Sequence, residues 1–423
     1  MIQSYGTIFL PLLVLFCLSS FAFFRRPAGA VLYLLWFRST FAVAAFLQIP
    51  GLAGLPFFVI AFAITWAIVA IGYVVTRRRP PPVLPMLSFY LVVGAMLLNT
   101  IWFAISPNPP VHLIDTMTKF VLPIIVYLGF SASITNSDDL SRMSRPLIAC
   151  FVTALIVGLF QSLVGYSYDY GHDVIVSGIR PVGTIIDANA YGIFLCLCAF
   201  IITPFAMEKN RPGMKLLLAL YVLAILLSKN RGSWIAALIA LSLGVIIYSR
   251  RLNIGRVLGG GLLLIALASP VIVQRFAALN EVDQFGQSQD TFSERLEQSS
   301  RLFLSAAESP FVGYGAGSAE QPWGNTRLAR PPHNDYVRVV YEFGFIVAVL
   351  YIIFLVDQAV RATRLIYRDE WRFGFGTLMG MVYLIVISMT QNVIYDTVSY
   401  SLVMLVLAIL HRSIRVSKLN EQS

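Results

Sequence analysis

The sequence predicts an all-α fold: a polytopic membrane helical bundle of about 12–13 transmembrane helices, with one large loop that contains short helices. Of the 423 residues, 58% are hydrophobic and 12% are charged, whereas a soluble domain carries about 25% charged residues. The hydrophobic residues form runs of about 20, the length of helix that crosses a ~30 Å hydrocarbon core. Lys and Arg residues cluster in the short segments between these runs.

About thirteen apolar runs are candidate membrane spans. They lie near residues 6–24, 28–47, 55–75, 83–105, 116–134, 146–165, 185–205, 214–227, 232–248, 257–273, 338–357, 373–389 and 392–411. Arg38 interrupts the second run, and the eighth run is short. The sequence therefore leaves both twelve and thirteen spans open.

Alternate junctions between the runs are basic. These junctions hold Arg25/Arg26, Arg77/Arg78/Arg79, Arg142/Arg145, Lys209/Arg211/Lys215, Arg250/Arg251/Arg256, Arg361/Arg364/Arg368/Arg372 and Arg412/Arg415/Lys418. Positively charged short loops stay in the cytoplasm, so we expect these junctions and the C-terminus there. With thirteen spans the N-terminus lies outside. With twelve, a broken or re-entrant pair near 28–75 accounts for the difference.

The chain divides into four parts on this topology. We expect transmembrane helices 1 to about 10 in residues 1–273, a large outer loop at 274–337, the C-terminal transmembrane helices at 338–411 and a cytoplasmic tail at 412–423. Thr291-Phe292-Ser293-Glu294 has the spacing of a capping box and predicts a helix within the loop. Ser309-Pro310 ends that helix, and the glycines that follow predict a turn.

The composition excludes several classes of protein. The net charge of +10 could indicate nucleic-acid binding, but its distribution in short junctions is that of a membrane topology signal. The 4 cysteines all lie within apolar runs, where they are expected to act as small buried hydrophobes and not as disulfides or metal ligands. The sequence contains no phosphate-binding glycine loop and no paired-carboxylate signature.

Arg231 is a cation in a tight outer turn between two apolar spans, 214–227 and 232–248. One interpretation is a structural ion pair with a distant acid. The other is an anion ligand, because the planar guanidinium matches phosphate oxygens in pairs. Arg180 and Arg295 are candidates for the same role. The residues Asp187, Ala188 and Asn189 lie at the start of the candidate helix 185–205. Their polar side chains are explained equally well by helix capping or by a functional role.

His333 lies at the start of an apolar helix, directly after two prolines, on the outer face and near several arginines. A lone histidine is often a structural residue. Its usual pKa of about 6.5 also leaves neutral imidazole available as a general base at neutral pH. The setting favours the second interpretation, so we predict a catalytic base.

Four stretches in order resemble one family, the O-antigen ligases and O-antigen or exopolysaccharide polymerases of bacterial inner membranes. They are Gly183-Thr184 with Asp187-Ala188-Asn189-Ala190-Tyr191, Ser228-Lys229-Asn230-Arg231-Gly232-Ser233-Trp234, Arg295 followed by Ser309-Pro310-Phe311-Val312-Gly313-Tyr314-Gly315, and His333-Asn334 with Gly344 after nine residues. One position departs from the ligase pattern, which has a second glycine where this chain has Val347. That departure favours polymerase over ligase.

The resemblance implies a glycosyltransferase with its active site facing the periplasm. The donor would be a glycan on undecaprenyl pyrophosphate, the acceptor a lipid-linked repeat unit or, for a ligase, lipid A-core or another acceptor, and no metal, nucleotide or other cofactor would be needed. Arg231 and Arg295 would hold the pyrophosphate with Arg180 as a weaker helper, Asn189 and Asn334 would contribute to substrate binding, and His333 would be the base of an inverting displacement. Expected partners are membrane lipids, a flippase and a chain-length regulator, with no nucleic acid.

A transporter is the competing class. It predicts charged residues deep within helices and internal repeats. We expect only Arg38 and Lys119 to be charged within the candidate spans, and no repeat is apparent, so an enzyme is favoured.

Overall fold

The computed structural model describes residues 87–105, 144–165, 181–185, 187–253, 291–320 and 333–420, with isolated helical residues between 119 and 131 and between 255 and 273. Its main elements are α4 (Leu87–Ala104), α7 (Ser144–Val164), α8 (Ala188–Ala206), α9 (Pro212–Leu227), α10 (Arg231–Ile247), α12 (Thr291–Ala306), α13 (Asp335–Thr363), α14 (Trp371–Ile387) and α15 (Thr397–Asn420). Two short 3-10 helices, Ser318–Glu320 and Arg364–Tyr367, join them. The described residues contain no strand.

Four helical stretches are long and apolar enough to cross a membrane: Leu147–Val164, Ala188–Ala206, Asp335–Tyr367 and Val398–Arg415. The helices α4, α9, α10 and α14 are apolar but shorter. Together they confirm the predicted all-α membrane bundle. The candidate spans at 6–24, 28–47 and 55–75 lie outside the described residues, so the number of spans and the four-part division stay predictions.

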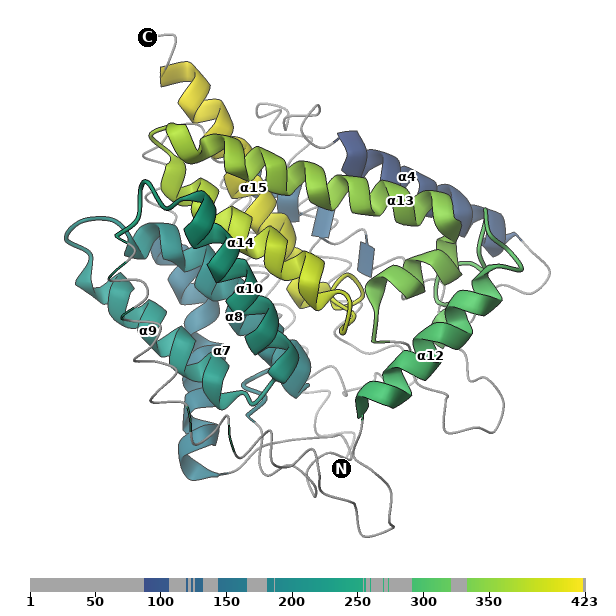
Figure 1. The fold of residues 1–423 in the computed structure, drawn as a ribbon, viewed down its shortest axis with the longest axis horizontal. Helices are drawn as coiled ribbons and strands as arrows, with labels where there is room; N and C mark the ends of the chain where they lie inside the picture. The colour runs from purple at the N-terminus through teal and green to yellow at the C-terminus, as the bar shows by residue number, and fades with distance from the viewer. Residues whose placement is uncertain are drawn as a thin grey trace, which may run out of the picture.

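The core of the bundle is built around α8 and α14. Nearly every side chain of α8 is buried, and α8 packs against α7, α9, α10, α14 and α15. The helix α14 lies between α8, α10, α13 and α15, and Figure 1 shows α15 behind it. The side chains of α13 that point away from the bundle are apolar, and Ile346, Val349, Ile352, Ile353 and Val356 are about half exposed. A surface of that kind fits lipid and not water.

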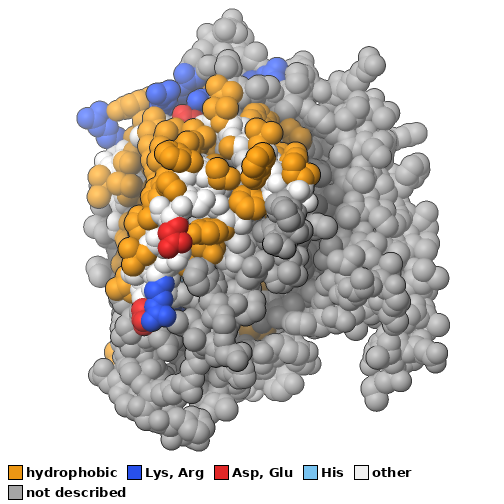
Figure 2. Space-filling model, turned by 90° about the vertical axis from the view of Figure 1, so that its right-hand side faces the viewer, with side chains coloured by type: hydrophobic (Ala, Val, Ile, Leu, Met, Phe, Trp, Pro, Cys, Tyr) orange, Lys and Arg blue, Asp and Glu red, His pale blue; other side chains and the backbone are white. Residues whose placement is uncertain are grey.

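Basic residues gather at one end of the bundle. The hydroxyl of Tyr248, after α10, donates to the carbonyl of Ala362 near the end of α13 at 2.7 Å, and Phe205 of α8 packs edge-on against Phe373 of α14. The helix ends that meet here carry Arg211, Lys215, Arg250, Arg251, Arg361, Arg364, Arg368 and Arg372. Figure 2 shows Lys and Arg side chains collected along one edge, above an apolar surface.

The long helix α13 is broken at Gly344, whose φ of 84° and ψ of 169° are not helical. The break leaves the carbonyls of Tyr341 and Glu342 without the N–H donors that a continuous helix would supply. They accept instead from the backbone N–H groups of Tyr314 and Gly315, both at 2.9 Å. The loop after α12 thus replaces part of the missing helical hydrogen bonding. The change of direction is visible where α13 approaches α12 (Figure 1).

The second half of α13 begins with a matching contact to the same loop. The backbone N–H of Phe345 donates to the carbonyl of Pro310 at 2.8 Å. A Cβ on Gly344 would collide with the backbone carbonyl of Phe311. The backbone of the loop therefore approaches α13 closely at Gly344. Val347, which stands where the ligase pattern has its second glycine, is buried within regular helix.

An ion pair is buried in the first segment of α13. The Nε of Arg338 lies 3.0 Å from a carboxylate oxygen of Glu342, and the two side chains are 2% and 0% exposed. The other oxygen of Glu342 accepts from the hydroxyl of Tyr395 at 2.9 Å, and the guanidinium of Arg338 lies 3.5 Å from the centre of the Tyr395 ring. The N–H of Ala319 also donates to Glu342, at 3.4 Å. Glu342 therefore joins α13, the loop and the segment before α15.

The prediction that only Arg38 and Lys119 are charged residues within candidate spans is wrong, because Arg338 and Glu342 lie within α13. Arg338 is the first residue of the candidate span 338–357 and is expected on the outer side, and Glu342 is not among the candidate residues. The two charges are four residues apart and lie on the same face of the helix. Each neutralises the other within one turn, so the helix retains an apolar exterior.

Replacing Gly344 by Ala is expected to destabilise the protein. Alanine in this backbone region costs about 1–3 kcal/mol, and its Cβ adds the collision with the loop. The matched control is Gly94→Ala in α4, where a Cβ meets nothing within 4 Å. Thermal unfolding of both variants in detergent should show a lower midpoint for Gly344→Ala alone. Equal midpoints would contradict the role given to Gly344.

Removing Glu342 is expected to cost far more than removing the acid of a comparable exposed pair. Breaking a buried ion pair costs about 3–5 kcal/mol, whereas exposed pairs contribute about 0–1 kcal/mol. The helix provides its own control, because Asp357 and Arg361 form an i,i+4 pair with side chains 32% and 27% exposed. Thermal unfolding should rank Glu342→Ala well below Asp357→Ala. The reverse order would show that the buried pair does not stabilise this segment.

Candidate functional site

The last turn of α14 and the residues after it are contacted by three other elements. The backbone N–H of Asp335, at the start of α13, donates to the carbonyl of Ser388 at 2.8 Å. The guanidinium of Arg295, in α12, donates to the carbonyl of Thr390 at 3.3 Å. The hydroxyl of Thr390 lies 3.4 Å from the place that a Cβ on Gly232, at the start of α10, would occupy. Segments far apart in the sequence thus meet here, at the end of the bundle opposite the basic residues.

Asp335 fixes the start of α13. It is fully buried, and one carboxylate oxygen accepts from the hydroxyl of Ser388 at 2.8 Å and from the N–H groups of Val393 and Ile394 at 3.0 and 3.4 Å. A carboxylate held by three donors has little freedom to move. The residues directly before it, among them His333, are therefore held next to the end of α14.

Three helices begin at this end with the same type of cap. The side chains of Asp187, Asn230 and Asn334 accept from the backbone N–H three residues later, at 2.6, 3.2 and 3.1 Å. Capping leaves other N–H groups of each first turn available, and the aligned peptide dipoles give each helix start a partial positive charge. Several helix starts at one end favour an anion there. The capping role considered for Asp187 is confirmed.

The starts of α8 and α10 are in direct contact. The side-chain amide of Asn230 donates to the carbonyl of Asn189 at 3.0 Å. A Cβ on Gly192 would lie 2.8 Å from the same amide nitrogen, so the two helices can approach this closely only with glycine there. Arg231 follows Asn230 as the first residue of α10 and is half-buried.

The structure brings five of the six predicted site residues to this end: Asn189, Arg231, Arg295, His333 and Asn334, all partly exposed. Arg180 lies outside the described residues. The side chain of Asn334 caps α13, which is a structural task that does not depend on substrate. The catalytic and binding roles of these residues stay predictions.

Sequence reasoning missed the residues that hold the site together. Asp335, Ser388 and Thr390 make the connections between α13, α12 and α14, but none was named as a candidate. A signal was present for Asp335, an acid directly after the His-Asn pair at the start of an apolar helix. The contact of Ser388 and Thr390 with residues 53 and 95 positions away has no local signature.

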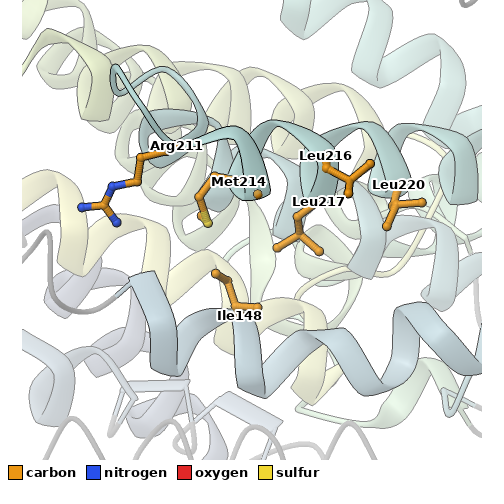
Figure 3. A pocket seen from close by; sticks show the side chains of 7 residues that line it. Ile148, Arg211, Met214, Leu216, Leu217 and Leu220 are labelled. Atoms are coloured by element: carbon orange, nitrogen blue, oxygen red, sulfur yellow. The ribbon is translucent and has the colours of Figure 1, made fainter.

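Within the described part of the chain, no three His, Cys, Asp or Glu side chains lie close enough together to hold a metal ion. A groove of about 490 Å³ lies between α7 and α9, lined by Ile148, Arg211, Gly213, Met214, Leu216, Leu217 and Leu220. Figure 3 shows Ile148 facing Met214 and Leu217 across it. Since α9 begins at the basic end, this groove is separate from the candidate site.

Comparison with known proteins identifies the central part of this architecture. Residues 216–352 match the family model described as O-antigen ligase, and this range contains Arg231, Arg295, His333 and Gly344. A comparison with curated proteins finds no match. The chain is a membrane protein, and over residues 216–352 it is similar to the O-antigen ligase family.

Proposed function

We propose that the chain is the polymerase of a bacterial surface polysaccharide, an O-antigen or an exopolysaccharide. It transfers an undecaprenyl-pyrophosphate-linked glycan to a lipid-linked repeat unit by metal-independent, inverting glycosyl transfer. The family match supports ligase or polymerase activity of this general type. The active site faces the periplasm of the inner membrane and the C-terminus is cytoplasmic, in keeping with the basic end of the bundle.

One observation carries the proposal: α10, α12 and the start of α13 all reach the end of α14. These elements bear Arg231, Arg295 and His333 respectively. Two guanidinium groups beside capped helix starts give a site suited to a pyrophosphate, and a histidine next to them gives a base. Electrostatic stabilisation of the leaving group is the largest requirement of such a reaction.

The displacement occurs in one step. His333 removes the proton of an acceptor hydroxyl, whose oxygen forms a bond to the anomeric carbon of the donor sugar. The bond from that carbon to the pyrophosphate oxygen breaks, and its electron pair leaves with undecaprenyl pyrophosphate. Arg231 and Arg295, with Arg180 as a weaker helper, stabilise the charge on the leaving group. Attack opposite to the leaving group inverts the anomeric configuration.

Polymerase is preferred to ligase because Val347 replaces the second glycine of the ligase pattern. A ligase would use the same donor and the same three residues, with lipid A-core or another lipid as acceptor. A gene deletion separates the two. Loss of polymer with products of one repeat unit supports polymerase, whereas accumulation of long lipid-linked chains supports ligase. A flippase that supplies the donor and a chain-length regulator are the expected partners of a polymerase.

A transporter is expected to carry charged residues within its membrane helices, and Arg338 and Glu342 are charged residues within α13. They lie within the first turns of α13 and neutralise each other, which favours a structural role over a transport path. The direct test supplies purified protein with a lipid-linked repeat unit and sizes the products on a gel. A ladder of longer products is expected. If the purified, folded protein yields no longer product with any lipid acceptor, enzymatic transfer is ruled out.

His333→Ala is expected to reduce polymer formation by about 10²–10⁴-fold, the usual contribution of a general base. The initial rate of product formation by purified protein is the measurement. The amount of protein in the membrane and its unfolding midpoint should match wild type, because Asp335 and the Asn334 cap hold α13 independently. A wild-type rate for the variant would show that His333 is not the general base.

Arg231→Lys is expected to remain impaired although the charge is retained. An ammonium group cannot donate two parallel hydrogen bonds to phosphate oxygens, and a lost charge-assisted bond costs about 1.5–3 kcal/mol, which is roughly ten- to a hundredfold in rate. The control is Arg250→Lys, an exposed arginine at the basic end, where no change is expected. Full activity of Arg231→Lys would show that Arg231 contributes only a positive charge and not a pair of directed hydrogen bonds.

A further inference from the structure

The side chains of α12 form a packed face, an exposed apolar face and an exposed charged face that borders the apolar one. At about 100° per residue, Arg295, Leu302 and Ala306 lie within about 40° of one another. Leu302 and Ala306 are buried, and Arg295 reaches Thr390. This face packs against the rest of the protein.

A second face of α12 is exposed and largely apolar, with one serine, Ser300, between Leu296 and Leu304. Leu296, Phe303 and Leu304 are 58%, 46% and 70% exposed, and they are centred about 120° around the helix from the packed face. Burying a side chain of this size is worth about 1.5–3 kcal/mol. Three of them in water on one face of a short helix would be a considerable cost.

The third face is charged. Glu297 and Arg301 form an ion pair with side chains 56% and 58% exposed, centred about 220° from the packed face and about 100° beyond the apolar one. The charged face borders the apolar one, with Leu304 and Glu297 about 20° apart. An apolar exposed face beside a charged one is typical of a helix in the membrane interface.

The apolar face of α12 continues directly into the lipid-facing surface of the bundle. The ring of Phe303 packs edge-on against Phe345, with 5.5 Å between ring centres. The next residue, Ile346, is 55% exposed and begins the outward apolar stripe of α13. The two surfaces therefore meet the same medium.

A second connection runs through α4. Phe311 and Val312, which follow α12, are exposed, and the side-chain amide of Asn99 in α4 donates to the carbonyl of Val312. The neighbours Leu98 and Trp102 are also exposed apolar side chains. A single apolar surface thus extends from α12 over the loop to α4.

We propose that α12 lies in the interface of the bilayer, on the side of the candidate site. Leu296, Phe303 and Leu304 insert among the lipid chains, and Glu297 with Arg301 faces water. The loop of residues 274–337 is expected from the topology to be extramembrane, and on this proposal its described helix α12 is docked on the membrane. A consequence, which rests on the proposed function, is that Arg295 lies at the depth of lipid phosphates, where the pyrophosphate of a lipid-linked donor would also be.

The test is a spin-label scan of α12 in the full chain. Single cysteines replace Leu296, Glu297, Arg301, Phe303 and Leu304, and each variant is labelled with a nitroxide and reconstituted into vesicles of phosphatidylethanolamine and phosphatidylglycerol. Of the 4 native cysteines, Cys150, Cys196 and Cys198 are buried and Cys17 lies outside the described residues, so labelled wild-type protein measures the background from all of them. Collisions with oxygen report lipid, and collisions with a water-soluble nickel chelate report water.

Positions 296, 303 and 304 should show several-fold higher oxygen-to-nickel ratios than positions 297 and 301. Nickel accessibility at 304 equal to that at 301 would overturn the proposal and place α12 in water. Low accessibility to both reagents at 296 and 304 would also overturn it, because another protein surface would then cover the face. None of these readouts uses enzymatic activity, so the result stands apart from that of the glycosyl-transfer assay.

Discussion

The arrangement of this end of the protein depends on the interrupted backbone hydrogen bonding at Gly344. An unbroken α13 would satisfy its own carbonyl groups and leave no place for another chain segment. Because Gly344 leaves the helical conformation, N–H groups of the loop at 310–315 donate to the carbonyls of Tyr341 and Glu342. Backbone groups near a bilayer need such partners. The break thereby fixes the loop, and with it α12, against the transmembrane helices.

The side chain of Glu342 reinforces the same connection. It accepts from Arg338, from Tyr395 and from the backbone of Ala319, so one carboxylate joins three separate segments. Removing one member would leave the others buried without a partner, which costs more than the pair contributes. Arg338 therefore has a structural role, because Glu342 matches its charge within the protein.

The sequence predicted the elements better than their connections. The 20-residue apolar runs, the capping residue Asp187 and the start of α12 follow from local patterns, which is why they could be identified. The contacts of Ser388 with Asp335 and of Thr390 with Arg295 join residues 53 and 95 positions apart, and local patterns do not encode such distances. The burial of Glu342 was not predicted for a related reason. A charged residue near the start of an apolar run indicates the end of a membrane span, unless a buried partner such as Arg338 is known.

The positive character of the candidate site comes from two sources that respond differently to mutation. The capped starts of α8, α10 and α13 contribute backbone N–H groups and partial charges, which no side-chain substitution outside the caps removes. The guanidinium groups of Arg231 and Arg295 contribute full charges and directional donors. An anion would therefore still be attracted to this end without either arginine, but it would not be held in one orientation. In the proposed reaction, displacement at an anomeric carbon requires the attacking and leaving oxygens in line, so orientation matters more than attraction. The arginines are accordingly expected to matter most in the chemical step, and the helix starts in binding.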